Sequence, residues 1–102
     1  MKLVRDEIPT VIRESGSWCV CRSVNTREEH VEWLVKKMTE EVREFVENPS
    51  YEEAGDIFEV LRALSSLYDL HMDEVMCVAD DKKKERGGFS LGIILETVGE
   101  DY

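Results

Sequence analysis

Several features that mark other classes of protein are scarce in this chain. It has three cysteines, an odd number, and its first residues lack the apolar core of an export signal. We therefore expect no framework of disulfide bonds. No apolar run approaches the length of a membrane span, so no membrane-spanning segment is expected. Together these absences predict a cytoplasmic protein.

Basic residues are also in short supply. The chain has 13 Lys and Arg against 23 Asp and Glu, a net charge of −10. A nucleic-acid backbone is bound by a basic surface that displaces counterions, so no nucleic-acid partner is expected. A polyphosphate ligand would have to arrive together with a metal ion. The two histidines, His30 and His71, do not have the spacing to complete a zinc site with Cys19 and Cys21.

The length of 102 residues predicts one domain, spanning 1–102. The apolar pattern has the helical period over most of the chain, and the expected helices cover 5–14, 26–46, 50–68 and 73–85. Thr26 and Ser50 are expected to cap the helices that follow them, and Gly16 and Gly87 are expected to end the helices before them. Segments 17–24 and 89–98 read as strands that can pair. The expected fold class is therefore all-α in the main, an antiparallel helix bundle with a small β pairing of the two terminal parts. Broad apolar stripes on so short a chain predict a homodimer or a higher homo-oligomer.

The chain is rich in acidic residues, and several of them form two clusters. The first is Glu40-Glu41-x-x-Glu44 and the second is Glu53-x-x-Asp56, with a short break between them. Residues three or four apart share one face of a helix. Two helices joined by a short turn run antiparallel, so the carboxylates would converge, which is tolerable only with a cation between them. Mg²⁺ first, and Mn²⁺ next, are the ions suited to such oxygen ligands.

Position on the predicted helices ranks these carboxylates. Glu53 falls inside the apolar stripe of its helix and Asp56 lies at the edge, where a carboxylate is costly unless it is paired or binds a metal. On the preceding helix, Glu41 borders the stripe, Glu44 lies further round and Glu40 is nearly opposite. The residues ranked as inner metal ligands are Glu41, Glu44, Glu53 and Asp56, with Glu40 outside them. The alternative is an acidic face that is simply solvated.

Three cations lie on the inner face of the last predicted helix: Lys82, Lys83 and Arg86. One interpretation is a favourable interaction with the carboxyl end of that helix. The other is a phosphate clamp that faces the carboxylates. Both stay open at the level of the sequence.

Three segments, taken in order, resemble a known superfamily. These are residues 2–9 (KLVRDEIP), the two acidic clusters, and residues 83–89 (KKERGGF). They are similar to the all-α nucleotide pyrophosphohydrolases, the superfamily of MazG, the dimeric dUTPases and phosphoribosyl-ATP pyrophosphohydrolase. The similarity is greatest to the small phosphoribosyl-ATP pyrophosphohydrolase-like proteins, and it spans nearly the whole chain.

The resemblance implies a dimeric helical fold of MazG-like type that holds Mg²⁺ through the four inner carboxylates. It implies an enzyme that hydrolyses the α–β phosphoanhydride of a nucleoside triphosphate to a monophosphate and pyrophosphate. The cations that match its motifs, and are expected to bind substrate, are Lys2, Arg5, Lys83 and Arg86, with Lys82 as an alternative to its neighbour. Only eight residues separate Glu44 from Glu53, so an insertion that binds the base in MazG itself is missing here.

The chemistry expected at such a site can be stated in physical terms. Glu40 and Glu44 are the candidates to orient or deprotonate an attacking water, while Lys83 and Arg86 would stabilise the departing pyrophosphate. The same site would serve for phosphoribosyl-ATP, the substrate of a step in histidine biosynthesis. A non-catalytic helical dimer or adaptor is the third interpretation.

Overall fold

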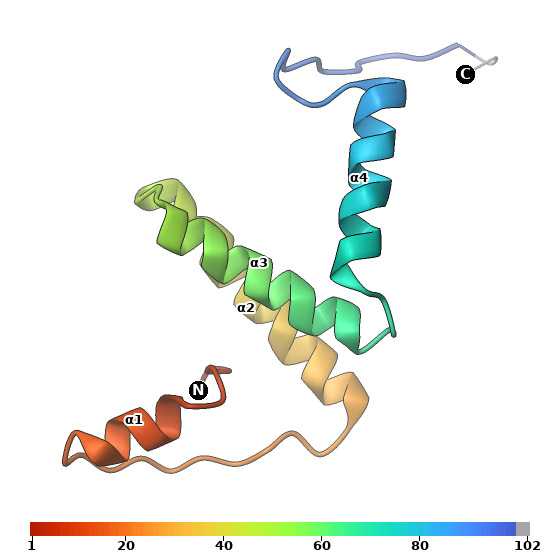
Figure 1. Cartoon of the computed structure of the whole chain (residues 1–102). Helices are drawn as coiled ribbons and strands as arrows, with labels where there is room; N and C mark the ends of the chain where they lie inside the picture. The colour runs from red at the N-terminus through yellow and green to blue at the C-terminus, as the bar shows by residue number, and fades with distance from the viewer. Residues whose placement is uncertain (100–102) are drawn as a thin grey trace. The chain divides into compact units, whose positions relative to one another are not determined.

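The computed structural model describes residues 1–99, and over this range all regular structure is helical (Figure 1). The helices are α1 (Ile8–Glu14), α2 (Arg27–Glu47), α3 (Tyr51–Ser66) and α4 (Met72–Arg86). The expected all-α class is therefore confirmed, while the MazG-like type of bundle stays a prediction. The chain divides into two compact units, Met1–His71 and a second that begins at Met72. One domain over 1–102 also stays a prediction.

The expected β pairing is not formed by residues 17–24 and 89–98, which run as irregular chain. Alternating side chains favour an extended backbone, but a strand also needs a partner for its N–H and C=O groups, and a lone pair of strands is marginal in water. Neither segment buries an apolar face that would offset this, since Trp18 is 81% exposed and Ile94 is also 81% exposed. The sequence pattern of these two segments therefore did not predict correctly whether they pair as strands.

Helices α2 and α3 form a hairpin with antiparallel arms, the main packing contact of the first unit (Figure 1). The chain turns at residues 48–50, where the hydroxyl of Ser50 accepts a hydrogen bond of 3.0 Å from the backbone N–H of Glu53. This N-cap confirms the predicted helix break. Leu34 on α2 and Val60 on α3 are the buried apolar residues between the arms. The hairpin is what brings the two acidic clusters together.

The start of α2 is fixed by a local network that the sequence predicted in part. Thr26 caps the helix by accepting a 3.0 Å hydrogen bond from the N–H of Glu29, as expected. The carboxylate of Glu29 accepts from Arg22 at 2.6 Å and from the backbone N–H of Asn25 at 2.7 Å. The pKa of Glu29 is lowered to about 2, first by the Arg22 hydrogen bond and then by the Asn25 N–H. The ionised form of Glu29 is therefore favoured by folding.

This network predicts a defined pH dependence of stability. Because the pKa of Glu29 is lower in the folded state than its ordinary value of 4.5, its contribution is fully present above that value and is lost as the pH falls toward about 2. Urea unfolding of the wild type and of Glu29→Gln between pH 6 and about 2 measures the effect. The wild type should have the larger free energy of unfolding at pH 6. The difference in this free energy between the wild type and Glu29→Gln should shrink as the pH falls from 4.5 toward about 2. A difference in the free energy of unfolding that stays constant with pH would contradict the lowered pKa of Glu29.

Glycines end α1 and α4 in the way the sequence predicted. Gly16, two residues after α1, has φ +88°, and Gly87, directly after α4, has φ +83°. Glycine adopts this left-handed region without the strain that a Cβ would bring, which makes it a common helix terminator.

None of the described helices combines the length and the apolar character needed to cross a membrane.

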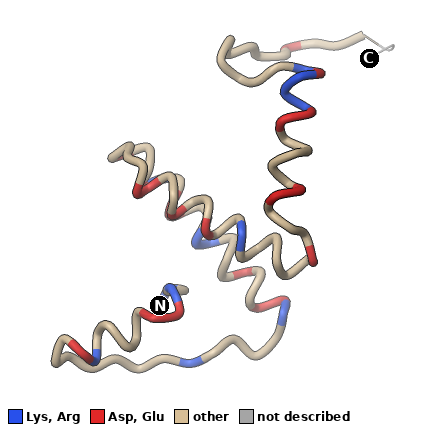
Figure 2. Tube along the Cα trace, viewed as in Figure 1, with Lys and Arg blue, Asp and Glu red and all other residues tan. Residues whose placement is uncertain are grey.

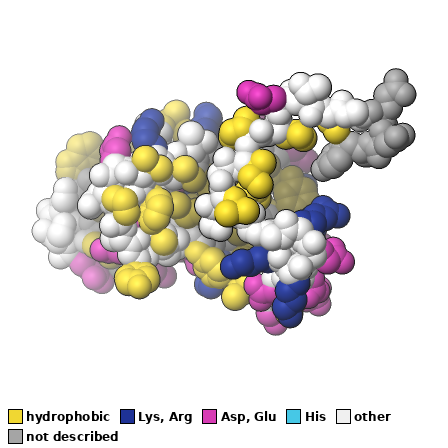
Figure 3. All heavy atoms as spheres, turned by 90° about the horizontal axis from the view of Figure 1, so that it is seen from above, with side chains coloured by type: hydrophobic (Ala, Val, Ile, Leu, Met, Phe, Trp, Pro, Cys, Tyr) yellow, Lys and Arg dark blue, Asp and Glu magenta, His cyan; other side chains and the backbone are white. Residues whose placement is uncertain are grey.

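Large apolar side chains remain exposed on the first unit. On α2, Val35 is 52% exposed, Val42 43% and Val46 71%. Figure 3 shows hydrophobic side chains at the surface of the chain. The only apolar residues of the described chain that are fully in the core are Leu34 and Val60. The apolar stripes foreseen in the sequence are thus largely uncovered within one copy of the chain.

Candidate metal centre

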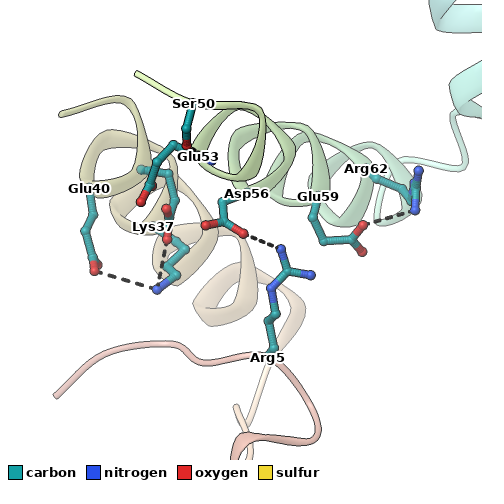
Figure 4. A network of polar contacts seen from close by, with 9 residues as sticks. Arg5, Lys37, Glu40, Ser50, Glu53, Asp56, Glu59 and Arg62 are labelled. Carbon is teal, nitrogen blue, oxygen red and sulfur yellow. Dashed lines mark hydrogen bonds and ion pairs between the residues drawn. The ribbon is translucent and has the colours of Figure 1, made fainter. Parts of the chain in front are cut away.

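The α2–α3 hairpin gathers the predicted carboxylates into two groups. Figure 2 shows acidic positions along both helices, and Figure 4 shows the site from close by. In each group, one oxygen from every member lies within 4.8 Å of the others. The groups are Glu40, Glu41 and Glu44 on α2 alone, and Glu41, Glu53 and Asp56 across the two helices. Glu41 belongs to both and is therefore the centre of the cluster.

Glu41 is also the deepest of these residues, with 6% of its surface exposed. Its Oε1 lies 3.2 Å from the Nζ of Lys37. Its Oε2 is buried without a hydrogen-bond partner among the described residues, and the same holds for Oε2 of Glu53. A buried charged oxygen without a partner is costly. These two oxygens, one from each helix, are suited to a cation that binds between the helices.

Two cations of the chain already contact carboxylates of this cluster. Lys37 lies 3.6 Å from Glu40 as well as 3.2 Å from Glu41, and Nη2 of Arg5 donates to Oδ1 of Asp56 at 2.7 Å (Figure 4). Two positive charges beside five carboxylates leave a net negative site. A divalent cation would reduce this excess.

The sequence analysis did not single out Lys37. It precedes Glu40 by three residues and Glu41 by four, so it shares their face of α2. That spacing was the signal available in the sequence. The pairing of Arg5 with Asp56 spans 51 positions, and no local pattern indicates it.

Burial and mutual repulsion raise two of the carboxyl pKa values. The pKa of Glu44 is raised first by burial and then by the neighbouring carboxylate of Glu41. The pKa of Glu53 is raised first by burial and then by Asp56 and Glu41. A raised pKa means that the folded chain holds these protons more tightly than the unfolded chain, so ionisation at neutral pH works against folding. A bound cation would relieve the same repulsion.

The structure separates the four residues ranked as inner ligands. Glu41, Glu53 and Asp56 meet across the helices, whereas Glu44 lies with Glu40 and Glu41 on α2. Glu40, ranked outermost, has a side chain 26% exposed and is a member of this second group. Asp56, at the edge of its stripe, has a side chain 33% exposed. Glu40 is thus less exposed than Asp56, contrary to the order expected from position on the helices.

The predicted substrate-binding cations fall in both units. Lys2 and Arg5 are exposed residues of the first unit, and only Arg5 contacts the cluster. Lys82, Lys83 and Arg86 belong to the second unit, where they are exposed on the last turns of α4. Their role toward a phosphate stays a prediction.

The donor set is made of carboxylate oxygens alone, with neither sulfur nor imidazole. Hard divalent cations prefer such ligands. The carboxylate oxygens of Glu41 and Glu53 that lack a partner among the described residues could therefore contact such a cation. Comparison of this chain with family models, curated proteins and solved structures found no match.

Proposed function

We propose that this protein is an Mg²⁺-dependent nucleoside triphosphate pyrophosphohydrolase, which cleaves the α–β phosphoanhydride and releases a nucleoside monophosphate and pyrophosphate. The observation that carries the proposal is the buried Glu41, whose Oε2 has no hydrogen-bond partner among the described residues and which is grouped with Glu53 and Asp56 of the opposite helix. An acidic face that is only solvated would not bury a carboxylate in this way. The similarity of residues 2–9 and 83–89 to this superfamily supports the choice of reaction.

The proposal gives each carboxylate a role. Glu41, Glu53 and Asp56 would hold the metal, and Mn²⁺ is the second candidate ion. When bound, the metal supplies charge neutralisation of the triphosphate oxygens and a more acidic water. Glu44 is the better candidate to accept a proton from that water, because its raised pKa makes it a stronger base than an ordinary carboxylate. Glu40 is the alternative.

Cations of the chain are proposed to act on the phosphates of the substrate. Arg5 pairs with Asp56, and we expect it to contact an anion bound beside the metal. Lys83 and Arg86, with Lys82 as the alternative lysine, are proposed to stabilise the departing pyrophosphate. Product analysis of nucleoside triphosphates incubated with Mg²⁺ tests the reaction.

Assembly into a homodimer or a higher homo-oligomer is part of the proposal. It rests on the exposed apolar side of α2, where Val35, Val42 and Val46 would bury their surface against a second copy. We expect sedimentation equilibrium to give at least twice the chain mass of 11.8 kDa. Val42→Glu should shift the population toward the monomer, since it would place a charge in the contact. A wild-type monomer at tens of micromolar, an ordinary assay concentration, would contradict the assembly.

A further inference from the structure

A pocket of about 470 Å³ adjoins the carboxylate cluster within the first unit. Its volume lies in the range of small-molecule sites. Residues 3–8 form one wall and the α2–α3 hairpin forms the other. The apolar lining consists of Leu3, Val4, Ile8, Leu34, Val60 and Ala63.

The pocket lining mixes charged and apolar residues, and Asp6, Glu7 and Glu59 line it in addition to the carboxylates of the cluster. On α3 its lining residues include Asp56, Val60 and Ala63, and on α2 they include Glu41 and His30. Because the helices are antiparallel, Glu41 and Asp56 mark the same end, and His30 and Ala63 mark the other. Seven residues of helix from Asp56 to Ala63 rise about 10 Å. A ribonucleoside covers a comparable length from its 5′ oxygen to the far edge of its base.

The charged end has the chemistry of a site for a metal-bound anion. Arg5 and Lys37 line the pocket there, each paired with a carboxylate of the cluster. A ligand that matches this lining has a metal-bound anionic group at the end marked by Glu41 and Asp56. Beyond that end it has an apolar group whose polar edge can donate hydrogen bonds to a carboxylate such as that of Glu59. His30 lies at the distant end, and an imidazole can both donate and accept a hydrogen bond.

We propose that this pocket receives the nucleoside part of the substrate, with the base between residues 3–8 and the Leu34–Val60 side of the hairpin, and with His30 at the edge of the base. The inference rests on the proposed function and adds to it the source of base recognition. Residues 3–8 form the wall of the pocket opposite the hairpin and are proposed to cover one face of the base.

Equilibrium titration with non-hydrolysable analogues tests this assignment. The probes are the Mg²⁺ complexes of the α,β-methylene forms of ATP, GTP, CTP and UTP, with Mg²⁺ and inorganic triphosphate as the reference. At least one analogue should bind the wild type about tenfold more tightly than triphosphate does. Ala63→Leu, which fills the distant end of the pocket, should weaken that analogue about tenfold or more and leave triphosphate unchanged. Ala54→Leu makes the same change at an exposed position of α3 and should alter neither affinity.

A second variant keeps the test decisive if Ala63→Leu does not fold. His30→Ala should change the order of affinity among the four analogues and leave the binding of triphosphate unchanged. Triphosphate that binds as tightly as every analogue would overturn the pocket assignment while leaving the proposed function in place. Failure of triphosphate and of every analogue to bind with Mg²⁺ would overturn both.

Discussion

Mg²⁺ or Mn²⁺ at a hundredfold excess over its dissociation constant is expected to raise the unfolding midpoint of the metal-free protein by on the order of 10 °C or more. A ligand that binds only the folded state at this excess adds roughly 2.7 kcal/mol. For a domain near 100 residues, 1 kcal/mol corresponds to about 4–8 °C. The physical source is relief of the repulsion that raises the pKa values of Glu44 and Glu53. Thermal unfolding followed by circular dichroism measures the shift.

Single substitutions distinguish stabilisation by a specific metal centre from a general effect of salt on the unfolding midpoint. Glu41→Gln and Glu53→Gln should each lose most of the shift, because each removes a charge from the group that spans both helices. Glu47→Gln is the matched control, since Glu47 is exposed at the end of α2 and belongs to neither group. It should keep the full shift. Equal stabilisation by Na⁺ at matched ionic strength, unchanged in Glu53→Gln, would mean that the clusters are only a solvated surface.

Loss of catalysis in the same carboxylate variants is the second large effect that we expect. With Mg²⁺ present, the wild type should convert a nucleoside triphosphate to the monophosphate and pyrophosphate. Glu41→Gln, Glu53→Gln and Asp56→Asn should each lower the rate by about 100-fold or more, because residues that merely orient metal ligands already cost about 10–100-fold. Glu40→Gln should be milder. Ion-exchange chromatography of the products, with circular dichroism to confirm folding, measures both quantities.

Two outcomes would count against this assignment. A diphosphate and orthophosphate as the first products would place the cleavage at the β–γ bond. An essential Glu40 together with a dispensable Glu53 would reverse the ranking of ligands made from their positions on the helices. Glu47→Gln again serves as the control, and it should retain the wild-type rate.

The helices, their limits and the acidic faces could be read from the sequence because these features are local. Thr26 and Ser50 cap the helices that follow them, as predicted, since a cap needs only a hydroxyl and an N–H three residues on. Gly16 and Gly87 follow the helices they were expected to end. The predicted strands were wrong because strand pairing is not a local property. The alternation of larger and smaller side chains over 17–24 is local, whereas a β ladder depends on a partner from a distant segment.

Other features of the candidate site were decided only by the tertiary structure. The sequence placed Glu41 at the border of an apolar stripe, but its burial to 6% depends on how closely α3 packs beside it. The pairing of Arg5 with Asp56, and the pocket that residues 3–8 form with the hairpin, join segments about fifty positions apart. The sequence by itself determined which residues carry charge and which helix face they share. Which carboxylate oxygens lack a partner was decided by the packing of the chain, because desolvation and charge repulsion depend on distance in space and not on spacing along the chain.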